Sequence, residues 1–355
     1  MKNIQYTTSP GIPPQSMDEE FLCHKKSPEW WYSTGYMHDE DGKMFSYQFT
    51  LADIRIYGLR FNILMIVLTD FETGKHYYNQ ESIFFGKNVM ITPDSVGVDG
   101  KAEMTFGAEK LGLNMSGENF SLTIGLDVVK PRVWHCDKGT LKMGIDNNWT
   151  YYWSYTNLAL SGKLVLDGRE YRVTGKGWFD KQGGPFTLYD HRTQWEWFSM
   201  RFFDNEEIML FSFPHVPYQD GTYIEKSGSY RRLNDLGVTQ FRRKTGVFGR
   251  ASPAQTPPSS HQLRKSYDYQ IEPLGWAEAK GLKFSSGWKV VMKGVKDEEY
   301  TLATIIDGQF NFFFFELLAE IKDTTGKVVG YSFVELLPGV YNEKNTMGAA
   351  FARVK

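Results

Sequence analysis

The chain has 355 residues, a formal net charge of −2 and an aromatic content of 16%. This length exceeds what one hydrophobic core usually organises, so we expect two domains. The near-neutral charge gives no electrostatic case for binding nucleic acid or an anionic membrane, and the two cysteines, Cys23 and Cys136, make neither a disulfide framework nor a metal cluster.

The first fifteen residues lack the apolar centre of a signal peptide. No later segment offers the run of about eighteen uncharged apolar residues that a membrane span needs. We therefore expect a cytoplasmic protein without a membrane span, and the sequence carries no signal for an oligomeric state.

The N-terminal third shows turn signals between β-prone runs. Residues 1–27 are polar and contain Pro10, Pro13 and Pro14, which predicts an extended arm over the surface. The runs 29–36 and 44–51 flank Asp41-Gly42, a dipeptide that accepts the positive φ of a tight hairpin turn. Asp-Gly recurs at 99–100, 167–168, 220–221 and 307–308, which indicates a meandering antiparallel sheet.

The middle of the chain alternates between apolar and polar residues. In Phe120–Val128 every second residue is apolar, which is typical of a strand with one buried face. Residues 163–173 form a predicted hairpin that runs into the stretch 175–185. Residues 194–202 and 208–213 are a second predicted strand pair.

The last third begins with a change in composition. Basic residues gather at Arg231, Arg232, Arg242, Arg243, Lys244 and Arg250. A Pro- and Ser-rich segment, about 250–262, follows and predicts a flexible loop. The basic segment is interpreted as a solvated loop, with a docking site for an acidic partner as the alternative. Strand-like runs resume at 301–306, 310–321 and 327–337, so the chain is predicted to be mostly β.

The stretch 175–185 is rich in glycine and holds one carboxylate among aromatic rings. If it is extended, Trp178 and Asp180 share a face, whereas Phe179 points to the opposite face. A carboxyl beside apolar surface keeps its proton near neutral pH and can act as a general acid. The alternative is a tight-turn Asp bonded to its own backbone.

Three further carboxyls, Glu29, Glu196 and Glu316, lie in aromatic or apolar runs. Glu29 and Glu196 are interpreted as salt-bridge partners of nearby basic residues, which leaves Asp180 and Glu316 as the predicted catalytic residues. The predicted ligand contacts, which plain core packing would equally explain, are Trp30, Trp31, Tyr152, Trp178, Trp195, Trp197 and Phe314.

Two features of the sequence bear on cofactor and metal binding. Gly175-Lys-Gly177 starts like a dinucleotide fingerprint, but Asp180 occupies the position that requires glycine. The seven histidines show no paired metal-ligand spacing. We therefore expect neither a cofactor nor a metal.

Together, a series of short motifs resembles the two-domain lipocalin-like family of the carotenoid hydratases (hydroxyneurosporene synthase). The motifs, which extend from about residue 28 to about residue 340, are Glu29-Trp-Trp-Tyr, Leu68-Thr-Asp70, Lys130-Pro131 with His135, Tyr151-Tyr-Trp-Ser154-Tyr-Thr156, Gly177-Trp-Phe-Asp180-Lys-Gln, Trp195-Glu-Trp-Phe198 and Gly330-Tyr-Ser-Phe-Val-Glu335-Leu.

The resemblance implies two consecutive lipocalin-like antiparallel β-barrel or sandwich domains, which we expect at 28–190 and 191–355. The family includes hydratases of C=C bonds, such as kievitone hydratase, fungal cyclases that form decalins by Diels–Alder reaction, and bacterial proteins encoded with export systems. Its central motif usually reads Trp-x-Asp-His and then, after Gln, Glu or Asn, a Trp. Here Lys181 replaces the His and Gly183 replaces the Trp.

The sequence thus predicts a cofactor-free enzyme that binds an elongated hydrophobic unsaturated small molecule. The missing His and Trp favour cyclisation over hydration or isomerisation of C=C bonds, because a cyclase mainly orients its substrate. A carrier that binds a hydrophobic metabolite without chemistry is the alternative function.

Overall fold

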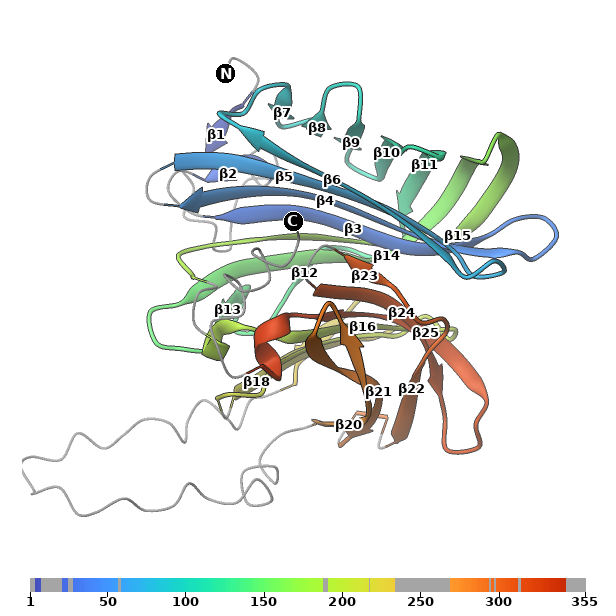
Figure 1. Ribbon diagram of the computed structural model, residues 1–355. Helices are drawn as coiled ribbons and strands as arrows, with labels where there is room; N and C mark the ends of the chain where they lie inside the picture. Colours follow the sequence, from blue (N-terminus) through green and yellow to red (C-terminus); the bar gives the residue numbers. More distant parts are fainter. Residues whose placement is uncertain are drawn as a thin grey trace, which may run out of the picture.

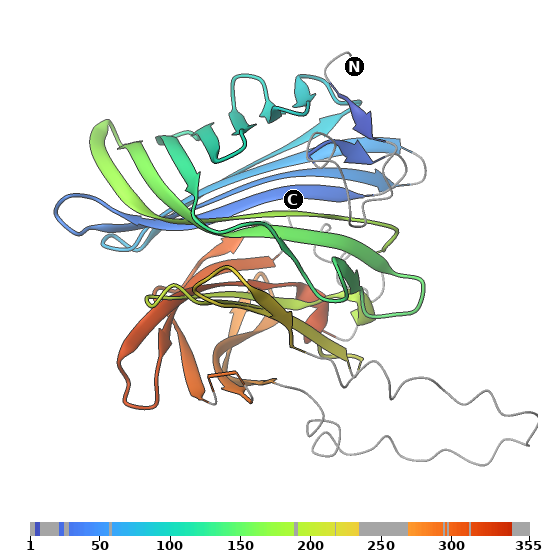
Figure 2. The ribbon, with the colours of Figure 1, turned by 180° about the vertical axis from the view of Figure 1, so that it is seen from behind.

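The protein is built almost entirely from β-strands that form two large sheets stacked on each other (Figures 1 and 2). The helical elements among the described residues are two 3-10 turns, η2 (His191–Thr193) and η4 (Pro338–Val340). This confirms the predicted mostly β fold with two barrel-like units. The computed structural model describes residues 4–7, 21–24, 28–56, 59–187, 191–216, 218–233, 269–293, 295–296, 298–311 and 314–342.

The N-terminal sheet has 13 strands, is antiparallel throughout and curls into a nearly closed barrel. Its edge strands, β6 and β7, do not pair with each other among the described residues. In the order of the sheet the strands are β6 (Lys75–Phe84), β5 (Leu59–Asp70), β4 (Met44–Ile56), β3 (Glu29–His38), β15 (Arg169–Gly183), β14 (Trp149–Leu166), β11 (Phe120–Val128), β10 (Lys110–Ser116), β9 (Ala102–Phe106), β8 (Ser95–Val98) and β7 (Val89–Ile91), while β12 (Val133–Trp134) and β13 (Thr140–Lys142) pair with β14.

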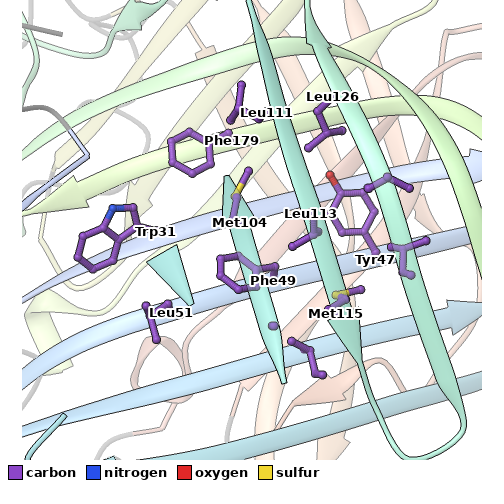
Figure 3. Packing of buried hydrophobic residues seen from close by; sticks show 14 of the residues in the cluster. Trp31, Tyr47, Phe49, Leu51, Met104, Leu111, Leu113, Met115, Leu126 and Phe179 are labelled. Atoms are coloured by element: carbon purple, nitrogen blue, oxygen red, sulfur yellow. The ribbon is translucent and has the colours of Figure 1, made fainter. Parts of the chain in front are cut away.

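Buried side chains fill the inside of this barrel, and Figure 3 shows part of that packing. Strand β11 illustrates the cause, because its apolar residues alternate as predicted and every one from Phe120 to Leu126 is buried. From the opposite wall Phe49 and Phe179 complete the packing. The interior of the barrel is therefore a hydrophobic core.

The C-terminal sheet has 10 antiparallel strands and forms a half-barrel with a core of its own. Its strands are β19 (Tyr230–Arg232), β18 (Tyr218–Ile224), β17 (Glu207–Phe213), β16 (Glu196–Phe202), β25 (Val328–Leu336), β24 (Phe314–Lys322), β22 (Glu299–Thr304), β21 (Leu282–Met292) and β20 (Tyr269–Ala279), with β23 (Phe310–Asn311) beside β24. A separate pair, β1 (Tyr6–Thr7) and β2 (Cys23–His24), lies at one end of the N-terminal barrel.

The predicted hairpins are present, with one exception among the Asp-Gly dipeptides. Strands β3 and β4 pair around Asp41-Gly42, and β14 and β15 pair around Asp167-Gly168. Asp220-Gly221 lies inside β18, so the turn predicted there is wrong. Asp220 is buried and bound by Arg232, whose Nη2 is 2.5 Å from Oδ2, and this ion pair holds the dipeptide in the sheet.

The N-terminal arm also differs from its prediction where it is described. Phe21 and Cys23 are buried, and the ring of Phe21 stacks on Phe106 with centroids 3.9 Å apart. The indole Nε1 of Trp31 donates a hydrogen bond to the Phe21 carbonyl at 2.8 Å. This part of the arm thus packs into the barrel end and does not lie over the surface.

The glycines of the central stretch allow β15 to lie close to β3. A Cβ added at Gly175 would lie 2.1 Å from the carbonyl oxygen of Tyr36 and 2.7 Å from Cα of Met37. Both contacts are backbone atoms of the neighbouring strand and cannot turn away. Only a residue without a side chain fits here.

We expect Gly175→Ala to lower the free energy of unfolding by about 1–3 kcal/mol, the usual range for overpacking. Urea unfolding measures this loss. Thr174→Ala is the control, because Thr174 is exposed on the same strand. An equal midpoint for both variants would contradict the predicted clash.

The two sheets are joined by a buried ion pair at one end. Lys130, which follows β11, is 3% exposed and places its Nζ 2.7 Å from Oε2 of Glu207 on β17. The same ammonium donates to the carbonyls of Asn205 at 2.6 Å and Glu225 at 2.7 Å. Asn157 of β14 donates to the other oxygen of Glu207 at 2.8 Å. This network fixes β14 and β17 in one relative position.

The chain passes from the first sheet to the second between Gly183 and Glu196. The division near residue 190 stays a prediction. The predicted flexible loop at 250–262 lies outside the described residues, as do the basic residues Arg242, Arg243, Lys244 and Arg250.

Candidate functional site

A layer of aromatic and apolar side chains separates the two sheets, and we call it the interface layer. It joins β3, β14 and β15 of the N-terminal sheet to β16, β17, β24 and β25 of the C-terminal sheet (Figures 1 and 2). Its buried members are Tyr32, Tyr36, Cys136, Leu141, Met143, Tyr152, Trp178, Trp195, Trp197, Met209, Phe211, Phe213, Phe314, Leu318, Phe333 and Leu337.

Asp180 lies on the face of β15 that borders this layer. Trp178 donates an indole hydrogen bond to its Oδ1 at 2.6 Å, so the two side chains share a face as predicted. Phe179 points the other way, into the barrel core. Because Asp180 pairs with Ser154 on one side and Tyr32 on the other, it lies in mid-strand, and the turn alternative is wrong.

A short hydrogen-bonded chain supports Asp180. Ser154 donates to Oδ1 of Asp180, and Nε2 of His135 lies 2.7 Å from the Ser154 oxygen. Since the serine hydrogen is used on Asp180, the Ser154 oxygen must accept from His135, which assigns the proton to Nε2. His135 is neutral, because burial lowers its pKa to about 3. Ser154 and Trp178 both donate to Oδ1, and the Tyr152 hydroxyl also donates to the Asp180 carboxyl.

Burial raises the pKa of Asp180 to about 7, against the opposing effect of its donors. The residue is 4% exposed, and among the described residues no cation lies within ion-pair distance of it. The positive charge of Arg201 favours the ionised form of Asp180, but this effect is smaller than that of burial. Asp180 is thus poised between its acid and base forms near neutral pH.

Two more carboxyls lie on the opposite wall. Glu316 of β24 is 3% exposed and accepts a hydrogen bond of 2.5 Å from the hydroxyl of Tyr32 on β3. Directly beside it in the ladder is Glu335 of β25, which in turn lies beside Trp197 of β16. Burial and the neighbouring Glu335 raise the pKa of Glu316 well above its usual range. Tyr32 thus links the strand next to Asp180 with this second acidic group.

Arg201 is the cation of the interface layer. It is 2% exposed and donates to the Thr34 carbonyl and the Ser199 hydroxyl at 3.3 Å each. Its Nε has no hydrogen-bond partner within the described part of the chain. Its guanidinium carbon lies 5.3 Å from the ring centroids of both Trp178 and Phe333. Among the described residues, this one cation acts on Asp180 and Glu316, and Glu335 is a third carboxyl beside them, so we expect most of the three to be protonated at neutral pH.

The structure brings most of the predicted ligand contacts together. Trp178, Trp195, Trp197, Tyr152 and Phe314 all belong to the interface layer. Trp178 and Trp197 meet edge to face with centroids 6.2 Å apart, and Trp197 donates to the Tyr152 hydroxyl at 3.1 Å.

Trp30 and Trp31 point to opposite faces of β3, as the alternation predicts. Trp30 is half-buried at the edge of the interface layer, stacked on Trp195 with centroids 6.2 Å apart. Trp31 lies in the barrel core, away from Asp180, with the Lys181 ammonium 3.8 Å from its ring centroid. The role of each as a ligand contact stays a prediction.

Both departures from the expected central motif concern one buried group, Glu29. Lys181 and Gly183 point into the barrel, on the face of β15 opposite Asp180. The Lys181 ammonium pairs with Oε2 of Glu29, and a Cβ on Gly183 would lie 2.3 Å from Cβ of Glu29. Lys181 binds Glu29, and Gly183 leaves room for the Glu29 side chain. Neither departure from the motif alters the face of β15 that carries Asp180.

The surroundings of Glu29 form an internal charge network. Although burial disfavours its charge, Lys181 and His24 hold the pKa of Glu29 at about 2, as the predicted salt bridge requires. Cys23, Glu29 and Asp53 offer three potential metal ligands within 4.8 Å of one another. Lys181 and Arg60 already neutralise the two carboxylates, so these residues fit a closed ion-pair network.

Glu196 differs from its predicted role. It is buried and accepts hydrogen bonds from the hydroxyls of Ser285 at 2.5 Å and Tyr341 at 3.0 Å. No basic residue among those described lies within ion-pair distance, so the predicted salt bridge is wrong. Hydroxyl donors satisfy the buried carboxyl instead.

Two pockets lined by described residues lie elsewhere on the molecule. One of about 980 Å³ lies over β7 to β11 and includes Asp99, Lys101 and Glu103. One of about 260 Å³ includes Trp134, Arg231 and Arg232. Asp180 lines neither pocket. It is 4% exposed, and its neighbours Trp178 and Tyr152 are fully buried, so side chains pack closely around it.

We expect the free energy of unfolding to fall as the pH rises from about 4 to about 7. The folded protein keeps the Asp180 proton up to a pKa of about 7, whereas the unfolded chain releases it near 4. Each retained proton changes stability by about 1.4 kcal/mol per pH unit in this window. The low pKa of Glu29 acts only below this window, and the low pKa of His135 opposes the Asp180 effect below about pH 6.5, whereas the raised pKa values of Glu316 and Glu335 add to it. Urea unfolding at pH 5 and pH 7 measures the slope, and an equal slope in Asp180→Asn would contradict this origin.

Five members of this site were not among the site residues predicted from the sequence: Ser154, His135, Tyr32, Arg201 and Glu335. Ser154, Tyr32 and Glu335 stand inside motifs noted above, and strand register would have placed the first two beside Asp180. No local signal marks Arg201, and the motif around Glu335 does not place it near Asp180, because both residues reach the site from the other sheet.

Comparisons with known proteins agree with this architecture. A search of curated proteins found no match. Among solved structures, an AttH-type protein from Nitrosomonas europaea is 18% identical with a TM-score of 0.75, and the match covers 94% of this chain and all of that one. Kievitone hydratase from Nectria haematococca is 15% identical with a TM-score of 0.67, over 97% of this chain and 98% of that one. CghA is 11% identical with a TM-score of 0.51, over 96% and 98%.

At these identities the structural matches establish a shared two-sheet fold, as the resemblance in sequence implied. Among the described residues, no helix has the length and apolar character that crossing a membrane requires. The family model described as AttH-like matches residues 13–257, which is more than half of the chain. This chain therefore belongs to the AttH-like family.

Proposed function

We propose that the protein is a cofactor-free enzyme that adds water to, or shifts, a C=C bond of an elongated hydrophobic metabolite. The observation that carries the proposal is Asp180, a carboxyl among aromatic rings whose pKa of about 7 lets it give and regain a proton. Trp178 donates a hydrogen bond to the acid, and Trp197 packs edge to face on Trp178; both would stabilise positive charge on the substrate through their π faces.

The buried carboxyls favour a reaction that begins with proton transfer over the cyclisation that the sequence favoured. Hydration and isomerisation both begin with protonation of a C=C bond, whereas cyclisation needs only orientation and polarisation. The replacement of the motif His by Lys181 was the reason to rank cyclisation first, and Lys181 binds Glu29 on the other face of β15. One structural neighbour, kievitone hydratase, bears the name of this chemistry.

The substrate would enter along the edge of the interface layer. Trp30, Phe186 and Glu335 are half-buried there, whereas Trp178 and Trp197 are buried. Opening this edge requires the sheets to part locally, because side chains fill the space around Asp180. A flat, flexible polyene needs less opening than a branched ring system of the same volume.

Incubation in D2O with farnesol or retinol, followed by mass spectrometry, tests the proposal. Hydration adds the mass of one water and leaves one deuterium on carbon. Isomerisation leaves the mass of the starting material plus carbon-bound deuterium. Both should require folded protein, so heat-denatured protein is the control.

Two other results would contradict acid catalysis. A rearranged product of unchanged mass without carbon-bound deuterium would favour cyclisation. Probe that binds in native mass spectrometry and is recovered unchanged would favour the carrier. A carrier would need the same opening of the layer edge as the enzyme, because side chains fill the space around Asp180.

A further inference from the structure

Most buried carboxyls of this protein have a cation or a pair of hydroxyl donors as partners. Lys181 pairs with Glu29, Lys130 with Glu207 and Arg232 with Asp220. Each of these ion pairs is a structural contact, because a cation compensates the buried negative charge of the carboxylate. Glu316 and Glu335 differ from them.

Glu316 is only half satisfied. Its Oε1 accepts from Tyr32, whereas its Oε2 is buried and has no hydrogen-bond partner among the described residues. Glu335 is the residue directly opposite on the neighbouring strand. Side chains so placed have Cβ atoms about 4.5–5.5 Å apart, which brings the two carboxyls within reach of each other.

Two carboxylates at this separation cannot both stay ionised in a desolvated layer. The groups that face the pair are Asp180 from β15, Tyr32 from β3, Arg201 and Trp197 from β16, and the indole of Trp195, which donates to Glu335. Arg201 supplies one positive charge against three carboxyls. One proton shared between Glu316 and Glu335 therefore removes the repulsion and gives the orphan Oε2 a partner.

Glu335 is the member of the pair that solvent reaches. It is half-buried at the edge of the interface layer, while Glu316 and Asp180 are 3% and 4% exposed. Burial between the sheets and the charge of Asp180 nevertheless raise the pKa of Glu335 above its usual range. A molecule or a water that enters the layer would thus meet Glu335 first.

We propose that Glu335 is a further catalytic carboxyl of the interface site, with Glu316 as the positioning residue that shares its proton. The inference rests on the proposed function and adds a second acid–base group to it. Asp180 and Glu335 then stand on opposite sheets, one on each side of the bound C=C bond.

In the hydration, the π electrons of the substrate take the proton of Asp180 and form a C–H bond, which leaves a cation on the other carbon. A water held at Glu335 forms the C–O bond with its lone pair. The carboxylate of the Glu316–Glu335 pair takes the proton that this water releases, and solvent returns a proton to Asp180 and removes one from the pair. The sum is one water added across the double bond.

Two readouts test the inference, and one of them needs no substrate. In the full-length protein with 13C-labelled glutamate side chains, the carboxyl signals of Glu316 and Glu335 should titrate as a coupled pair in two steps. Glu335→Gln should lower the pKa of Glu316, because the neighbouring negative charge is gone. Independent titration of the two groups near their ordinary values would overturn the pairing.

The second readout is turnover of farnesol or retinol, whichever wild type converts. Glu335→Gln should lower the rate about 100-fold or more with binding of the probe unchanged, and Glu335→Asp should keep part of it. Glu320→Gln is the matched control, because Glu320 lies on β24 and pairs with Lys322 at 3.0 Å. Wild-type rates in Glu335→Gln would overturn the catalytic role while the proposed function stands. If wild type converts neither probe, the proposed function fails for these substrates, and the titration decides on the pair.

Discussion

Asp180→Asn should lower turnover about 100- to 10,000-fold, the range that a positioned general acid contributes, and leave the fold intact. The amide oxygen of Asn can still accept from Ser154 and Trp178, and the amide has the shape and neutral charge of the acid form of Asp180, which is the main form below its pKa of about 7. The proton donor is lost while shape and hydrogen bonds stay. Initial rates with a probe that wild type converts, together with urea unfolding, measure both quantities.

Asp127→Asn is the matched control, because Asp127 is more than half exposed on β11, far from the interface layer. The rate of wild type should also fall as the pH rises through the pKa of Asp180, at about 7, since the acid form is the active one. An Asp180→Asn variant with unaltered turnover would remove this residue from the chemistry. A variant that unfolds would instead point to a structural role.

Lys130→Met should lower the free energy of unfolding by about 3–5 kcal/mol, the range for breaking a buried ion pair on one side. The substitution keeps the length of the side chain but removes the ammonium that binds Glu207 and two carbonyls. Glu207 would stay buried with Asn157 as its main donor. Chemical denaturation followed by tryptophan fluorescence measures the loss, since tryptophans lie between the sheets.

Lys110→Met serves as the control for Lys130→Met. Lys110 pairs with Asp127 at 3.1 Å, and both side chains are more than half exposed, so we expect a change of about 0–1 kcal/mol. The double variant Lys130→Met, Glu207→Leu should recover part of the stability, because no unpaired charge is then buried. Equal losses for the two lysine variants would show that Lys130 does not hold the sheets together.

Much of the N-terminal sheet was predictable from local pattern. Alternation in Phe120–Val128 gives a strand with one buried face, and Asp167-Gly168 gives the turn between β14 and β15. Both signals act over a few residues, because side chains alternate along a strand and positive φ favours glycine. Asp220-Gly221 failed for a tertiary reason, since the ion pair of Asp220 with Arg232 holds it within a strand.

The sequence by itself determined the strands, the shared face of Trp178 and Asp180, and the family resemblance, because all three depend on the order and period of neighbouring residues. Tertiary structure alone decided that this face meets the second sheet, that Lys181 turns away to Glu29, and that Tyr32 reaches Glu316. The physical reason is that packing of one sheet on another depends on twist and on the shape of both faces. The alternation of residues in a single strand determines neither the twist of a sheet nor the shape of its face.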